Sequence, residues 1–131
     1  MAAVIHSRES FPEVFSALEE FKGSGLKGVF HAFTGTLQDS EKAVRMGFKL
    51  GIGGIVTFKN SGLDLIVKEI GVENIVLETD SPYLAPSPFR GKRNESSYLC
   101  IINRKVAEVC GLSEENVSSV TFSNSVELFG L

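Results

Sequence analysis

The strongest constraint on the fold is a unit that occurs four times along the chain, a short apolar run followed by an amphipathic helical pattern. The apolar runs cover residues 3–6, 27–33, 48–54 and 74–80. Nearly continuous apolar strands that alternate with helices are typical of a parallel sheet covered on its faces. We therefore predict an α/β fold with parallel strands and flanking helices, of the α/β-barrel or the doubly wound type.

Helix boundaries are indicated by capping residues and glycines. Ser10 with Glu13 has the spacing of a capping box, and Thr36 with Asp39 repeats the pattern. Gly47 is a helix stop. The predicted helices cover residues 12–22, 36–46, 63–70 and 97–109, followed by two short pieces at 113–120 and 124–129.

Composition narrows the class of protein. The 131 residues suffice for one domain, 43% of them are apolar, and the net charge of −3 argues against a general electrostatic grip on nucleic acid. No apolar run approaches the roughly 18–20 residues of a membrane span. Cys100 and Cys110 lie ten apart within one predicted helix, too far to be bridged. We expect a cytoplasmic protein with reduced thiols and no membrane contact.

Residues able to bind metal or phosphate lie where the predicted strands end. His6 and Arg8 share one face of the first strand, His31 ends the second, and Glu78 and Asp80 share one face of the fourth. Carboxyl ends of parallel strands meet at one edge, so His6, His31 and Asp80 could converge on a metal ion. Alternatively, each histidine is a hydrogen-bonded core residue, and the two acids only cap the following turn.

The segment after the fourth strand adds positive charge to this edge. Three prolines stiffen residues 81–95, and Arg90, Lys92 and Arg93 follow them directly. A stiff loop that holds cations next to carboxylates suits a combined metal and phosphate site. The alternative is a solvated surface turn with charges for solubility.

Four stretches of the chain resemble the TatD family of metal-dependent deoxyribonucleases, and the similarity runs from about Val4 to Leu131. They are "VIHSRE", "GVFHAFTG", "GFKLGIGGIVTFKN" and "VLETDSPYLAPSPFRGKRNES". The last is long and specific. The resemblance implies a TIM-like barrel of the amidohydrolase type that hydrolyses phosphodiester bonds in DNA, generally as an exonuclease. It also implies divalent metal ions, commonly Mg²⁺, with Mn²⁺ or Zn²⁺ as alternatives.

The resemblance also implies roles for individual residues. His6, His31 and Asp80 match positions of metal ligands, Asp80 would also act as general base, and Glu78 would support the site. For contact with substrate phosphates we choose four cations on our own account. They are Arg8, Arg90, Lys92 and Arg93.

The chain departs from the family pattern in its length and its histidines. Family members are about twice as long and begin with a strand carrying an H-x-H pair, whereas His6 and His31 are the only histidines here. We therefore expect residues 1–131 to form a single domain that corresponds to the C-terminal half of the barrel, about four strands, without the N-terminal half.

Three functions remain open at this point. The first is a TatD-type nuclease that contacts DNA locally and is either complemented by a separately encoded N-terminal half or represented here by a fragment. The second is a non-catalytic half-barrel that oligomerises or needs a partner half. The third is a related metal hydrolase acting on another ester or amide, which the close match of the loop motif disfavours.

Overall fold

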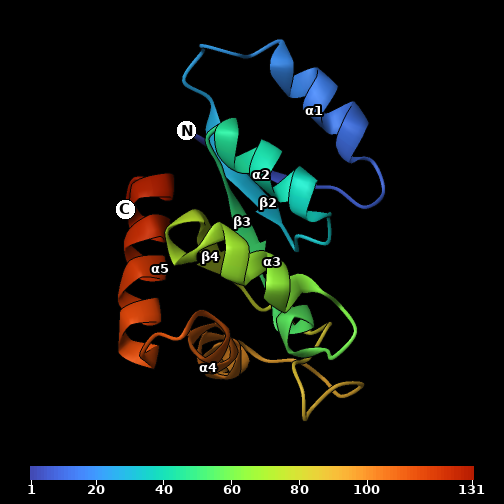
Figure 1. Cartoon of the computed structure of the whole chain (residues 1–131), viewed down its shortest axis with the longest axis vertical. Helices are drawn as coiled ribbons and strands as arrows, with labels where there is room; N and C mark the ends of the chain where they lie inside the picture. Colours follow the sequence, from blue (N-terminus) through green and yellow to red (C-terminus); the bar gives the residue numbers. More distant parts are fainter.

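A computed structural model describes all residues of the chain, 1–131, as a four-stranded parallel sheet with helices around it (Figure 1). The strands are β1 (Ala2–His6), β2 (Lys27–His31), β3 (Phe48–Ile52) and β4 (Ile75–Leu77), and they pair in the order β1-β2-β3-β4. Each strand lies next to its predecessor in sequence, so β1 and β4 form the two edges. The prediction of an α/β fold with parallel strands is confirmed.

Five α-helices connect and cover the strands: α1 (Phe11–Glu19), α2 (Leu37–Arg45), α3 (Leu63–Ile70), α4 (Leu99–Cys110) and α5 (Glu114–Phe129). Three single-turn 3₁₀ helices lie between them, η1 (Gly54–Thr57), η2 (Val72–Asn74) and η3 (Ser96–Tyr98). Figure 1 shows α2 and α3 lying over the sheet, whereas α5 stands to one side and contacts β4 and α4.

The main core lies between the sheet and its covering helices. Phe30 of β2 is 1% exposed and contacts Phe11, Phe15 and Phe48 at ring-centroid distances of 5.4–5.9 Å. Leu50 of β3 belongs to the same cluster of 17 buried residues. Burial of one such side chain contributes about 1.5–3 kcal/mol. This face fixes the strands in place.

The opposite face of the sheet carries the alternate residues of each strand. Val29 and Val76 pack there against Leu128 of α5 in a cluster of only three buried residues. Val4, on the edge strand β1, is 62% exposed. Near the start of β2, the Lys27 ammonium donates to the Glu127 carbonyl oxygen at 2.8 Å. Apolar cover on this face is therefore sparse.

Several predicted boundaries differ from the observed ones, since α1 ends at Glu19 rather than at residue 22 and β4 covers Ile75–Leu77 rather than 74–80. The Ser10 side chain caps no backbone group and contacts the Ser7 hydroxyl at 3.0 Å instead. Residues 113–120 and 124–129 belong to one continuous helix, α5, in which the Thr121 hydroxyl donates to the Val117 carbonyl oxygen. The capping box of Thr36 and Asp39 is formed as predicted, and both thiols are free.

None of the helices combines the length and the apolar character needed to cross a bilayer.

Candidate active site

The register of the sheet places the two histidines side by side. His6 and His31 are the last residues of β1 and β2 and are paired directly across the two strands. Their ring centroids lie 5.6 Å apart with an interplanar angle of 44°. His6 is exposed and His31 is half-buried. The expected convergence of strand ends therefore occurs for this pair.

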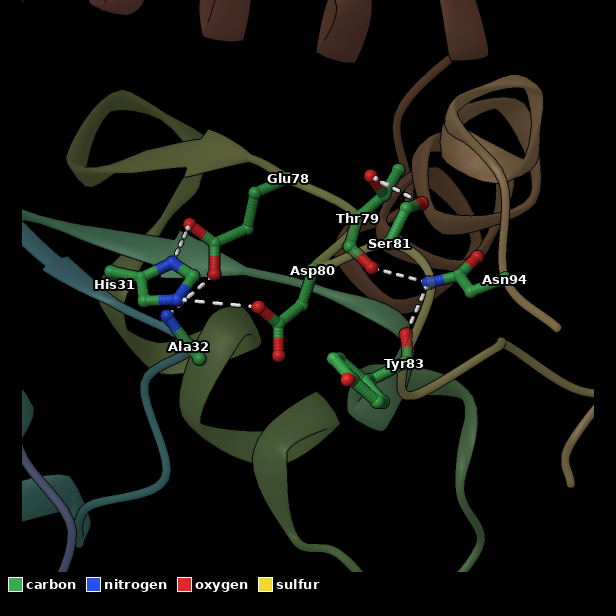
Figure 2. A network of polar contacts seen from close by, with 8 residues as sticks. All are labelled: His31, Ala32, Glu78, Thr79, Asp80, Ser81, Tyr83 and Asn94. Carbon is green, nitrogen blue, oxygen red and sulfur yellow. Dashed lines mark hydrogen bonds and ion pairs between the residues drawn. The ribbon is translucent and has the colours of Figure 1, made fainter.

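Glu78 follows β4 and holds His31 in a defined orientation (Figure 2). Its Oε2 lies 3.0 Å from His31 Nδ1, and its Oε1 accepts a hydrogen bond from the Ala32 N–H. A carboxylate only accepts hydrogen bonds when ionised, so the imidazole proton resides on Nδ1. The Nε2 lone pair of His31 is thereby left free to bind an ion, as is usual for histidine ligands supported by a carboxylate.

A glycine on β3 makes room for the Glu78 carboxylate. A Cβ atom on Gly51 would overlap Oε2 and Cδ of the Glu78 carboxylate, the latter at 2.8 Å, whereas a Cβ on Gly53 would lie 3.6 Å from its nearest neighbour, the Glu78 carbonyl oxygen. Glycines in a strand permit the close approach of another group. Here the approaching group is the side chain that orients His31.

Asp80 completes the cluster on the other side of His31. Its Oδ1 lies 3.4 Å from His31 Nε2, and Figure 2 shows the carboxylate pointing toward the ring. With a single ring proton, on Nδ1, two acceptors face each other, an unfavourable contact that a bound cation or a second proton on Nε2 would relieve. An imidazole nitrogen beside a carboxylate oxygen is also a donor set that divalent ions accept. The pair therefore fits a metal ion.

Two residues of the cluster have unusual backbone angles. Ala32 and Asp80 adopt φ values of 48° and 50°, in the left-handed region that residues other than glycine seldom occupy. Such conformations cost about 1–3 kcal/mol each and concentrate at functional sites. The Glu78 carboxylate binds the Ala32 N–H, and the Asp80 carbonyl oxygen accepts from the Tyr83 N–H at 2.9 Å. These bonds hold both residues in place.

The set of metal donors in direct contact is small. Glu78 uses its oxygens on His31 and Ala32, and no group of three or more His, Cys, Asp or Glu side chains has an arrangement that could hold a metal ion. His6 is near His31 but outside such a group. The structure therefore provides one close donor pair, His31 and Asp80, with His6 beside it.

The predicted phosphate-binding cations form no ion pair with the carboxylates. Arg90 stacks its guanidinium over the Phe58 ring at 4.0 Å. Arg8, Lys92 and Arg93 are exposed, and no ion pair of the chain includes any of the four cations. Their positive charge is available to a ligand.

Sequence reasoning missed Asn94, which organises the loop after β4. This residue is 2% exposed, and its Nδ2 donates to the carbonyl oxygens of Thr79 and Tyr83 (Figure 2). Its own N–H donates to the Pro82 carbonyl oxygen at 2.9 Å. No periodic pattern marks such a residue. The one signal is an amide side chain inside a proline-rich loop.

Comparisons with known proteins show which family the chain resembles. A family model described as TatD related DNase matches residues 1–130. The uncharacterized metal-dependent hydrolase YabD of Bacillus subtilis is 39% identical over 127 residues, which cover 96% of this chain and 50% of that protein. The 3'-5' ssDNA/RNA exonuclease TatD of Pectobacterium parmentieri is 33% identical over 137 residues, 100% of this chain and 53% of its own length.

Solved structures give the same result for the fold. The crystal structure of YJJV, a TatD homolog from Escherichia coli, superimposes with a TM-score of 0.92 at 23% identity, covering 100% of this chain and 51% of the other. A hydrolase TatD family protein from Entamoeba histolytica gives 0.87.

The parallel α/β fold is thus that of the TIM-barrel hydrolases, over about half of such a barrel. The chain belongs to the TatD family. It spans about half the length of the relatives it matches.

Proposed function

We propose that this chain supplies part of the active site of a divalent-metal-dependent nuclease that hydrolyses phosphodiester bonds at an end of DNA. The observation that carries the proposal is the pairing of His31 Nε2 with Asp80 Oδ1 at 3.4 Å, with Glu78 fixing the other ring nitrogen. In a TatD-family chain, that pair is where a metal ion and a substrate phosphate would meet.

The names of relatives support the reaction class. One is named a metal-dependent hydrolase and another a 3'-5' ssDNA/RNA exonuclease. His31 and Asp80 would hold the ion, with His6 as a further ligand after a small movement of its exposed ring. Mg²⁺ is our choice because it prefers carboxylate oxygens, with Mn²⁺ and Zn²⁺ as alternatives. A bound divalent ion supplies Lewis acidity and lowers the pKa of coordinated water.

The residues of the chain would move the proton. Asp80 Oδ2 makes no hydrogen bond and the side chain is 34% exposed, so this oxygen can accept a proton from an attacking water. The water oxygen forms the new bond to phosphorus, and the bond from phosphorus to the leaving oxygen breaks. That oxygen then takes a proton from solvent. Glu78 acts as a positioning residue, because its oxygens are engaged by His31 and Ala32.

Recognition of DNA would be local. The net charge of −3 gives no general attraction to phosphates, but Arg8, Arg90, Lys92 and Arg93 are unpaired and exposed. Guanidinium groups bind phosphate oxygens through two parallel hydrogen bonds. We assign the binding of substrate phosphates to these four cations.

The remaining half of the barrel would come from a partner. Because relatives are about twice as long as the matched region, we propose that a complementing N-terminal half, or a second copy of this chain, covers the sheet edges and adds metal ligands. A non-catalytic half-barrel is the second candidate, and the absence of any group of three or more potential metal ligands favours it.

The test measures nucleotide release from a labelled single-stranded oligonucleotide with Mg²⁺ or Mn²⁺, before and after EDTA. Asp80→Asn should lower the rate by about 10²–10⁴-fold, the usual contribution of a general base. Glu115→Gln, an exposed carboxylate on α5, is the matched control and should leave the rate unchanged. Metal-dependent release that is equal in both variants would contradict the assignment. No release, alone or with a complementing half, would leave the non-catalytic candidate.

A further inference from the structure

The loop that carries Asp80 also presents an uncovered aromatic ring. Tyr83 is 72% exposed, although tyrosine is usually at least half-buried. Its hydroxyl makes no hydrogen bond within the chain, and its ring belongs to none of the aromatic or cation–π pairs. An aromatic surface of this size in water needs a reason for its position.

Other rings nearby are already covered. Phe89 and Tyr98 stack on each other at 4.6 Å with an interplanar angle of 7°, and the Arg90 guanidinium covers Phe58. Tyr83 is therefore the ring of this region with free faces. Its neighbour Leu84 is also 41% exposed.

The exposed ring stands on a fixed base. The Tyr83 N–H donates to the Asp80 carbonyl oxygen at 2.9 Å, so one turn joins the ring to the proposed proton acceptor. The Tyr83 carbonyl oxygen accepts from the buried Asn94 amide at 2.7 Å. Figure 2 shows Tyr83 in this turn, on the Asp80 side of the network and away from His31. With its backbone fixed, the tyrosine has only two rotatable side-chain bonds to immobilise when a ligand stacks on its ring, so little conformational entropy is lost.

From these observations we propose that Tyr83 stacks on an unpaired nucleobase of the substrate, next to the phosphate that lies at Asp80. Bases stack on aromatic side chains in single-stranded nucleic acids without regard to sequence, because every base has a π-face. Bases within a duplex are already stacked and cannot offer that face. The inference rests on the proposed function and assigns to Tyr83 the contact with a base of a single strand or a frayed end.

The experiment compares binding of a labelled single-stranded oligonucleotide and of the same sugar-phosphate chain without bases, by fluorescence anisotropy. Tyr83→Ala should weaken binding of the normal oligonucleotide about 5- to 150-fold, which corresponds to about 1–3 kcal/mol for one stacked base. Tyr83→Phe keeps the ring and should bind within about twofold of the parent. The abasic chain should bind parent and Tyr83→Ala equally. Since the ring is 72% exposed, thermal unfolding should not change.

Each of the following results would overturn the stacking role, the nuclease proposal or both. Equal affinities of parent and Tyr83→Ala for the normal oligonucleotide, or Tyr83→Phe as weak as Tyr83→Ala, overturn the stacking role. Loss of cleavage in Asp80→Asn together with no effect of Tyr83→Ala refutes stacking alone and leaves the nuclease proposal standing. Weaker oligonucleotide binding by Tyr83→Ala, together with no metal-dependent cleavage by the parent, refutes only the nuclease proposal. No binding of any oligonucleotide refutes both.

Discussion

The two faces of the sheet differ in what their side chains do. The face toward α1, α2 and α3 is closed by a cluster of 17 buried residues, with Phe30 at 1% exposure. The other face has three buried apolar residues and ends in the pair of His31 and Asp80, with His6 beside it. Adjacent residues of one strand, such as Phe30 and His31, belong to different faces. Side chains alternate between the two faces of the sheet. One residue of a strand therefore packs in the core, and the next can take part in chemistry.

This separation has a physical reason. Strand positions are fixed by packing on the helix side, so residues on the opposite side can be chosen for polarity and reach. The left-handed angles of Ala32 and Asp80 are tolerated because the buried core behind them holds the strand ends. Substitutions on the two faces should therefore affect different measurements.

The largest effect is expected on the covered face. Phe30→Ala should lower the free energy of unfolding by about 3–5 kcal/mol, because it removes a ring that contacts Phe11, Phe15 and Phe48 and leaves a cavity. Chemical denaturation with linear extrapolation measures this change. Val4→Ala, on the open face and 62% exposed, is the control and should change it by less than about 0.5 kcal/mol. Similar losses of unfolding free energy in both variants would contradict the difference between the two faces of the sheet.

An intermediate effect is expected at the site itself. Gly51→Ala should displace the Glu78 carboxylate from His31 and weaken binding of Mn²⁺ by about 10–100-fold, the usual effect of losing a ligand's supporting partner. Titration calorimetry measures the affinity.

The matched control is Gly53→Ala, two residues along the same segment, where the added methyl meets ordinary contact distances. It should bind the ion as the parent does. Because the displaced group is the flexible end of Glu78, the unfolding free energy of Gly51→Ala should stay close to that of the parent. Equal ion affinities in the two variants would show that Glu78 does not position His31.

The smallest effect concerns the two thiols of α4. Burial and the nearby Glu73 raise the pKa of Cys110, whereas Cys100 is exposed. Fewer thiolates form at Cys110 at a given pH, so iodoacetamide should label Cys100 first at pH 8. A raised pKa in the folded state also means that folding loses stability as the pH rises above 9.0, the ordinary pKa of the thiol. Mass spectrometry of labelled peptides follows both rates, and faster labelling of Cys110 would contradict its position against the covered core.

The sequence was sufficient for the order of elements and for the pairing of strand ends. Helix α3 was predicted at its observed bounds because a serine and glycine pair and Gly71 delimit it. The convergence of His31 with Asp80 followed from the rule that parallel strands end at one edge. Helix α5 was predicted in two pieces because Thr121 and its polar neighbours interrupt the apolar pattern, whereas packing against β4 keeps the helix continuous.

Other features depend on contacts between distant segments, and the sequence pattern did not predict them. Nothing in the spacing of Glu78 and Gly51 indicates that one lies over the other, because strand register decides it. The anchoring by Asn94 joins residues 11 and 15 positions apart. The exposure of Tyr83 follows from that anchoring. Individual hydrogen bonds set the geometry of this loop, so no periodic sequence pattern predicts it.

His6 stands on β1, which pairs with β2 on one side and leaves its other backbone row open. The position of the His6 donor atom therefore depends on an edge strand that can fray. A molecule that pairs with this edge would restrain the imidazole, and an ion bound by the imidazole would restrain the edge. By linkage, each of the two ligands must tighten the other's binding by the same factor.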